Sequence, residues 1–175
     1  LSSLQKALKI RNSNADYLAY TAILMLQKKD IDPQEALSLI DLALSQDETN
    51  PFAQTALGLF YYNAGEPQRA SISLKQAIGK QVKHPLAWDL MIKIFRNDQS
   101  NNSAYRTALE ARLVVQNEAI YKHAIELAFQ RAEYRNCIKF GKEALSNTGD
   151  NPYFQYVVAQ SYMKLNQYPN ALTAL

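Results

Sequence analysis

Residues 51–84 read PFAQTALGLFYYNAGEPQRASISLKQAIGKQVKH, and this stretch holds two apolar helical patterns separated by a short break. The first pattern includes Leu57 and Tyr61, and the second includes Ala70, Leu74 and Ala77. Side chains three or four positions apart lie on one face of a helix. The stretch therefore predicts two helices of ~12–15 residues that pack against each other as a hairpin.

The break between the two patterns has the residues expected of a tight helix–helix turn. Gly65 tolerates the positive φ that is common just beyond a helix end. Pro67 follows two positions later, where a helix can begin without needing that residue's N–H. We therefore predict a turn near residues 63–66.

The same hairpin pattern recurs along the whole chain at a fixed period. Small residues recur at spacings of 34, 34, 33 and 34 in one series: Ala36, Ala70, Ala104, Cys137 and Ala171. A second series has spacings of 34, 34 and 33: Ala43, Ala77, Ala111 and Ala144. Pro51 and Pro85 lie in the same frame, 34 residues apart. Such self-similarity is the sequence signature of a repeat architecture.

The repeat frame predicts a single domain, residues 1–175, that is built from successive hairpins. Full units are expected at 15–50, 51–84, 85–117 and 118–151, with partial units at 1–14 and 152–175. Further turns are expected near residues 28–32, 97–102, 131–134 and 165–168. Helix starts are marked by an N-cap residue followed by proline, at Asp32-Pro33, Asn50-Pro51 and Asn151-Pro152.

These units resemble tetratricopeptide repeats, whose pattern is W-x2-L-G-x2-Y followed by A-x3-F-x2-A. The second unit has Gln54-x2-Leu57-Gly58-x2-Tyr61 and Ala70-x3-Leu74-x2-Ala77, and the third has Trp88 at the tryptophan position. Ile92 and Ile125 stand where the family has a small residue, which predicts either a wider spacing or a different crossing angle of those helices. The resemblance implies an all-α, right-handed superhelical array of antiparallel hairpins, called an α-solenoid.

Composition and charge favour an ordinary folded chain over several other classes. Hydrophobic residues make up 47% and charged residues 20% of the 175 residues. Nineteen Lys and Arg against 16 Asp and Glu give +3, interspersed rather than gathered into the basic stripe of a nucleic-acid binder. No apolar run approaches the ~18–20 residues that span a bilayer. We therefore expect neither nucleic-acid binding nor membrane insertion.

The ends of the chain suggest a piece of a longer protein. It begins at Leu1 without an initiating Met and stops at Leu175 inside a helical pattern. A lone cysteine, Cys137, excludes an internal disulfide but not an oxidising compartment. Cytoplasmic and bacterial periplasmic or envelope-associated locations both remain open.

The sequence contains none of the motifs that carry catalysis or bind cofactors. It lacks a G-x-S-x-G nucleophile elbow, a phosphate-binding glycine loop and an H-E-x-x-H metal motif. His123 and Glu126 have a spacing that can bind a metal, but a third ligand is not evident. Cys137 occupies a small-residue position and is expected in the core. We predict no enzyme activity, no cofactor and no metal.

The resemblance also indicates where a partner would bind. In the family, the first helix of each unit lines a concave groove through its non-packing positions. Carried over to this sequence, the expected partner-binding residues are Tyr62, Asn63, Asp89, Lys93, Arg96, Lys122, Glu126, Phe129 and Tyr156. Their mixed chemistry suits an extended peptide or a helix in a groove. Lys93, Arg96 and Lys122 favour an acidic partner segment, and Phe129 favours an apolar anchor within it.

Three functions remain open from the sequence. The first is a protein–protein interaction scaffold or adaptor. The second is the docking or regulatory arm of an enzyme whose catalytic domain lies outside these residues. The third is an oligomerisation module, in which the partner is another copy of the chain.

Overall fold

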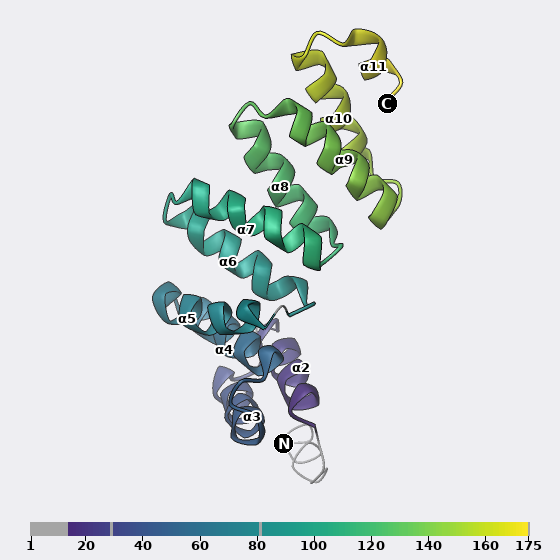
Figure 1. Ribbon diagram of the computed structural model, residues 1–175. Coiled ribbons are helices and arrows are strands. Elements are labelled where there is room, and N and C mark those ends of the chain that lie inside the picture. The colour runs from purple at the N-terminus through teal and green to yellow at the C-terminus, as the bar shows by residue number, and fades with distance from the viewer. Residues whose placement is uncertain (1–13, 29, 81, 175) are drawn as a thin grey trace. The chain divides into compact units, whose positions relative to one another are not determined.

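The computed structural model describes residues 14–28, 30–80 and 82–174, and every regular element in those ranges is an α-helix (Figure 1). The predicted partial unit at 1–14 therefore lies almost entirely outside the described residues. No described helix is both long enough and apolar enough to cross a membrane. The all-helical class predicted from the sequence is confirmed.

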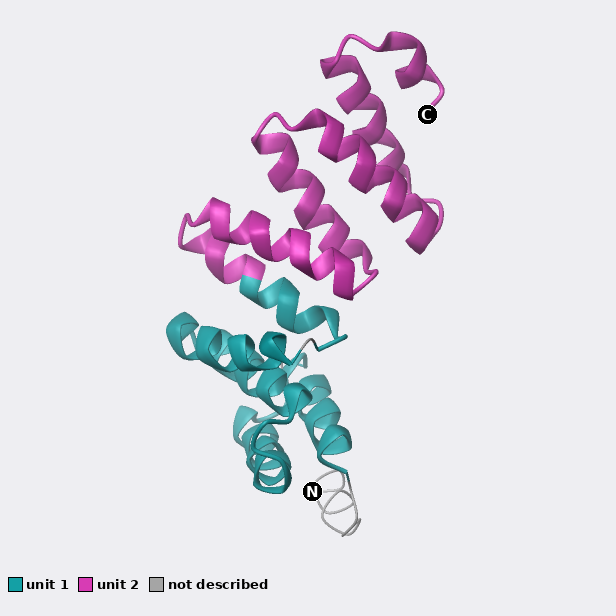
Figure 2. Ribbon diagram, viewed as in Figure 1, with its two compact units in different colours: residues 1–91 teal, residues 92–175 magenta. Residues whose placement is uncertain are grey.

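The chain divides into two compact units, residues 1–91 and 92–175 (Figure 2). The first contains α2 (Ala15–Leu26), α3 (Pro33–Gln46), α4 (Pro51–Asn63), α5 (Pro67–Gly79) and the start of α6 (Pro85–Asn97). The second contains the rest of α6, α7 (Asn101–Val114), α8 (Glu118–Gln130), α9 (Tyr134–Thr148), α10 (Pro152–Lys164) and α11 (Tyr168–Leu172). The continuous domain of residues 1–175 stays a prediction.

Consecutive helices pack as hairpins, and the hairpins stack within each unit. In residues 1–91, α2 packs on α3 and α4 on α5, while α4 also contacts both α2 and α3. In residues 92–175, α8 packs on α9 and α10 on α11, while α7 contacts α8 and α9 contacts α10. Each hairpin thus covers the apolar face of its neighbour, as repeat architectures require.

The helix starts form where the cap residues predict them. The side chains of Asp32, Asn50 and Asn151 accept hydrogen bonds from backbone N–H groups of the first turns of α3, α4 and α10, at 2.9–3.0 Å. A proline follows each cap at the first helical position. These contacts satisfy N–H groups that would otherwise have no partner inside the helix.

Four of the hairpin turns share one backbone geometry, although only one of them has a glycine at the position of positive φ. The residue two positions beyond the first helix has positive φ at Gly65 (76°), Gln99 (56°), Ala132 (57°) and Asn166 (58°). The next N–H donates to a carbonyl five residues back at 2.8–2.9 Å: Glu66 to Tyr61, Ser100 to Phe95, Glu133 to Ala128 and Gln167 to Tyr162. This is the Schellman motif, which satisfies carbonyls at the helix end.

Close helix packing depends on the small residues of the repeat. Ala70, Ala104 and Cys137 have no exposed surface. A Cβ atom built on Gly58 would lie 2.6 Å from the Leu74 side chain, and one on Gly141 would lie 2.4 Å from Val158 Cγ2. Ile92 and Ile125 are themselves buried, so the bulk at these positions is accommodated inside the core.

Candidate partner-binding surface

The nine residues predicted to bind a partner are divided between the two compact units. Tyr62, Asn63 and Asp89 lie in residues 1–91, on α4 and α6. Asn63 is exposed, and its side-chain amide donates to the Leu26 carbonyl oxygen at 3.0 Å, which links α4 to the end of α2. Tyr62 and Asp89 are half-buried. The other six residues lie in residues 92–175.

Arg96 and Lys122, two of the predicted partner-binding residues, form ion pairs within the chain. Arg96 Nη1 donates to Glu126 Oε2 at 2.9 Å and lies 3.3 Å from His123 Nδ1, so α6 is joined to α8. Lys122 pairs with Glu118 at 3.0 Å, and its ammonium lies 5.2 Å from the centre of the Tyr153 ring. Both cations therefore already have a carboxylate partner within the chain.

A cavity of about 320 Å³ lies between α8 and α10. It brings together three of the predicted residues, Glu126, Phe129 and Tyr156. Five other residues complete its lining: Ile125, Gln130, Tyr153, Val157 and Gln160. We refer to this site as the α8–α10 cavity.

Tyr153 is the aromatic lining residue that the sequence analysis did not predict. It lies three residues before Tyr156, so the two side chains share one face of α10. That spacing could have identified it. Burial raises the pKa of Tyr153 above its ordinary value, with smaller contributions from Glu126 and Cys137. The phenol therefore stays neutral at physiological pH.

The walls of the α8–α10 cavity are held by ring contacts. Phe129 meets the Tyr134 ring edge-to-face, with centroids 5.3 Å apart. Tyr153 meets Phe154 in the same way at 5.5 Å. Tyr156 is 58% exposed, so much of its ring is available to a ligand. The cavity thus combines two fixed aromatic walls with one exposed aromatic side chain and two carboxamides.

Cys137 and His84 pack against other residues of the chain. Cys137 is fully buried, and burial raises the pKa of its thiol to about 11, which leaves almost no reactive thiolate at neutral pH. His84 packs against Tyr20 and Phe52, and burial lowers its pKa. Among the described residues, no group of three or more His, Cys, Asp or Glu is placed to hold a metal ion.

A polar cluster fixes the turn between α8 and α9. Glu133 accepts hydrogen bonds from the Tyr105 hydroxyl (2.6 Å), Asn136 (2.8 Å) and Arg131 (2.8 Å). Because these donors favour the charged form, the pKa of Glu133 falls to about 2. Burial, together with the bond to Glu133, raises the pKa of Tyr105 to about 12.

The Glu133 cluster predicts a pH-dependent contribution to stability. Because the folded-state pKa lies below the ordinary value of 4.5, the stabilisation is complete above pH 4.5 and is lost as the pH falls towards 2. We expect Glu133→Gln to lower the melting temperature at pH 6, and the difference from wild type to shrink at pH 3. Thermal unfolding followed by circular dichroism measures this, with Glu110→Gln as the exposed control. A difference that stays constant between pH 6 and 3 would contradict the assignment.

The stacked antiparallel hairpins and the recurring Schellman turns define the tetratricopeptide-repeat fold, so the expected fold class is confirmed. Solved structures with this architecture cover nearly the whole chain. PilF of Pseudomonas aeruginosa is 17% identical with a TM-score of 0.72, over 98% of this chain and 78% of that one. MamA of AMB-1 is 14% identical with a TM-score of 0.65, over 91% and 87%.

A third similar structure, YrrB, is described as a TPR protein with an unusual peptide-binding site. It is 13% identical with a TM-score of 0.65, over 99% of this chain and 89% of that one. Neither the protein-family models nor the curated protein sequences that were searched contain a match to this chain. The similarity to these solved structures therefore establishes the fold of the chain but not its function.

Proposed function

We propose that this chain is a protein-interaction scaffold and that the α8–α10 cavity binds an apolar side chain of a partner segment. The observation that carries the proposal is the gathering of Phe129, Tyr153 and Tyr156 around one cavity, with the carboxamides of Gln130 and Gln160 beside them. Aromatic side chains supply large contact area, and the amides can hydrogen-bond a peptide backbone. Such a combination suits recognition of an extended peptide or a helix.

An acidic residue beside the apolar anchor fits the charges around the cavity. Arg96 contacts one of the lining residues, because its guanidinium pairs with the Glu126 carboxylate. Arginine has five N–H donors, so Arg96 can contact a partner carboxylate while it keeps Glu126. Residues 92–175 contain ten Lys and Arg against seven Asp and Glu, a balance of +3 that equals the net charge of the whole chain. This excess favours approach of an acidic partner.

The test of the proposal compares variants of the cavity wall. A partner is first isolated with the intact protein, and its affinity is then measured by isothermal titration calorimetry. We expect Phe129→Ala and Tyr156→Ala each to weaken binding at least tenfold, because buried aromatic anchors carry much of the energy of an interface. Leu113→Ala is the matched control, since Leu113 is an apolar side chain of α7 that is 74% exposed. Wild-type affinity in both aromatic variants, with helicity unchanged, would place the binding site elsewhere.

The charged part of the proposal is tested separately with the triple variant Lys93→Ala, Arg96→Ala, Lys122→Ala. We expect a slower association and a weaker dependence of affinity on salt between ~50 and 500 mM, because surface charges act mainly on the encounter rate. If the salt dependence of affinity is unchanged, the proposal of an acidic partner residue is wrong, and the proposal of an apolar anchor is unaffected.

A further inference from the structure

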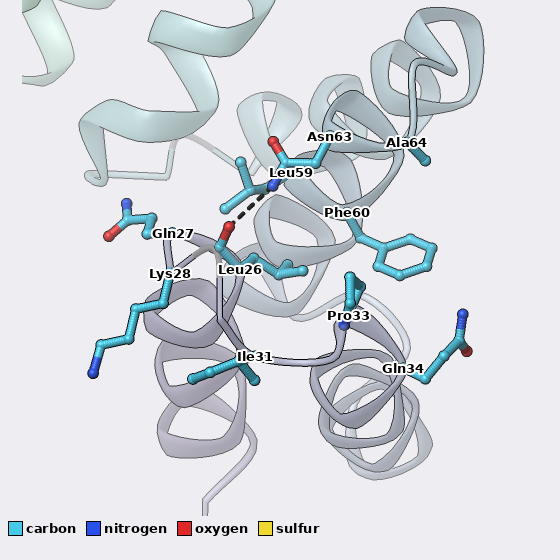
Figure 3. Close-up of a pocket in the computed structure, with 10 residues that line it drawn as sticks. All are labelled: Leu26, Gln27, Lys28, Ile31, Pro33, Gln34, Leu59, Phe60, Asn63 and Ala64. Atoms are coloured by element: carbon cyan, nitrogen blue, oxygen red, sulfur yellow. Dashed lines mark hydrogen bonds between the residues drawn. The ribbon is translucent and has the colours of Figure 1, made fainter.

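A larger cavity lies in the other compact unit, where the first hairpin departs from the repeat. The turn between α2 and α3 spans residues 27–32, whereas the turns after α4, α6, α8 and α10 have only three residues each. The longer turn borders a cavity of about 680 Å³ against the end of α4 (Figure 3). We call it the first-hairpin pocket.

The walls of the first-hairpin pocket are apolar and come from three helices. Leu26 ends α2, Pro33 begins α3, and Leu59 and Phe60 lie on α4. Ile31, from the long turn, completes the apolar lining. Leu26 and Leu59 are buried, while Ile31 and Phe60 are half-buried and leave surface open to a ligand. A bulky apolar side chain that entered would remove this surface from water.

Four further lining residues supply polar groups, and Lys28 carries the single charge among all ten. Three carboxamides, those of Gln27, Gln34 and Asn63, complete the polar part. Asn63 is held in place by its hydrogen bond to the Leu26 carbonyl, as Figure 3 shows. Carboxamides donate and accept, as a peptide backbone does, and an exposed ammonium attracts a carboxylate.

We propose that the first-hairpin pocket is a second peptide-binding site, which takes a bulky apolar side chain next to an Asp or Glu. The apolar side chain enters between Ile31 and Phe60, and the neighbouring carboxylate binds Lys28. The carboxamides hydrogen-bond the backbone on either side of the anchor. This site goes beyond the proposed function, because it lies within residues 1–91 and shares no residue with the α8–α10 cavity.

The probe is the capped peptide acetyl-Ala-Ala-Leu-Asp-Ala-Ala-amide, titrated into the full ¹⁵N-labelled chain by NMR. We expect amide shifts at residues 26–28, 31 and 59–64, and at least threefold weaker binding at these residues when Leu is replaced by Ala or Asp by Lys. Lys28→Glu should reverse the preference between the Asp and Lys peptides. Ala64→Trp, at an exposed lining position, should abolish the shifts by filling the pocket. Lys83→Glu, an exposed charge change in the same unit, is the matched control and should bind like wild type.

Three results would overturn the second site. They are no shifts at residues 26–28, 31 and 59–64, an unchanged peptide preference in Lys28→Glu, or equally tight binding of octanoate, which supplies an apolar chain and a carboxylate without a backbone. Shifts at residues 125–130 and 153–160 are read separately and report on the α8–α10 cavity. Failure of the second site is thereby distinguished from failure of the proposed function.

Discussion

Replacing Glu143 with alanine is expected to lower the free energy of unfolding by about 3 kcal/mol, because it leaves a largely buried arginine without its counter-ion. Arg112 Nη1 of α7 donates to both carboxylate oxygens of Glu143 in α9, at 3.0 and 2.8 Å. The Arg112 side chain is only 12% exposed, and its guanidinium also lies over the Phe140 ring, 4.5 Å from its centre. Water can therefore replace the lost carboxylate only in part.

Urea denaturation of matched variants measures this effect. Glu110→Ala removes an exposed carboxylate from the same helix as Arg112 and should change stability by no more than about 0.5 kcal/mol. The double variant Arg112→Leu, Glu143→Leu should recover much of the loss, since apolar residues of similar volume often replace a buried ion pair at little cost. If Glu143→Ala unfolds at the same urea concentration as Glu110→Ala, the pair contributes nothing to stability.

Replacing Gly141 with leucine is expected to cost about 3 kcal/mol through overpacking between α9 and α10. A Cβ atom at this position would lie 2.4 Å from Val158 Cγ2 and 3.6 Å from the Phe154 carbonyl oxygen, so a side chain fits only if Val158 or α10 moves. The gain in helix propensity when glycine is replaced is at most about 1 kcal/mol and does not offset the clash.

Two further variants separate packing from propensity, again by urea denaturation. Gly79→Leu lies at the exposed end of α5, where a Cβ atom meets nothing within 4 Å, and should be neutral or stabilising. Gly141→Ala should cost less in a Val158→Ala background than in wild type, because the opposing Cγ2 atom is absent. Equal costs in the two backgrounds would show that the contact with Val158 does not limit this position.

The part of the proposed binding surface that could be predicted from the sequence is its location on the first helices of the hairpins. The repeat frame placed Glu126, Phe129 and Tyr156 on groove positions, and the structure brings them to one cavity. The pairings of Arg96 with Glu126 and of Lys122 with the Tyr153 ring could not be derived in the same way. They join residues about thirty positions apart, and their geometry depends on how α6, α8 and α10 pack.

The first-hairpin pocket likewise depends on packing that could not be derived from the sequence. The turn between α2 and α3 is longer than the turns after α4, α6, α8 and α10, but a longer turn can either fold over its neighbour or stand away from it. In the folded chain, Ile31, Pro33 and Phe60 line a cavity there. The positive φ of Gln99 and Ala132 could not be predicted either, because their residue types do not favour this geometry, as Gly65 and Asn166 do.

The helices, their capped starts and the order of the hairpins could be predicted from the amino-acid sequence alone. These features depend on interactions within about fifteen residues: the apolar period of a helix, a capping side chain and a proline at the first turn. The tertiary structure was needed to show which cations pair with carboxylates, where the cavities lie and which glycine has no room for a side chain. Those properties arise where separate helices meet, and there the distance between side chains is set by packing rather than by their spacing along the chain.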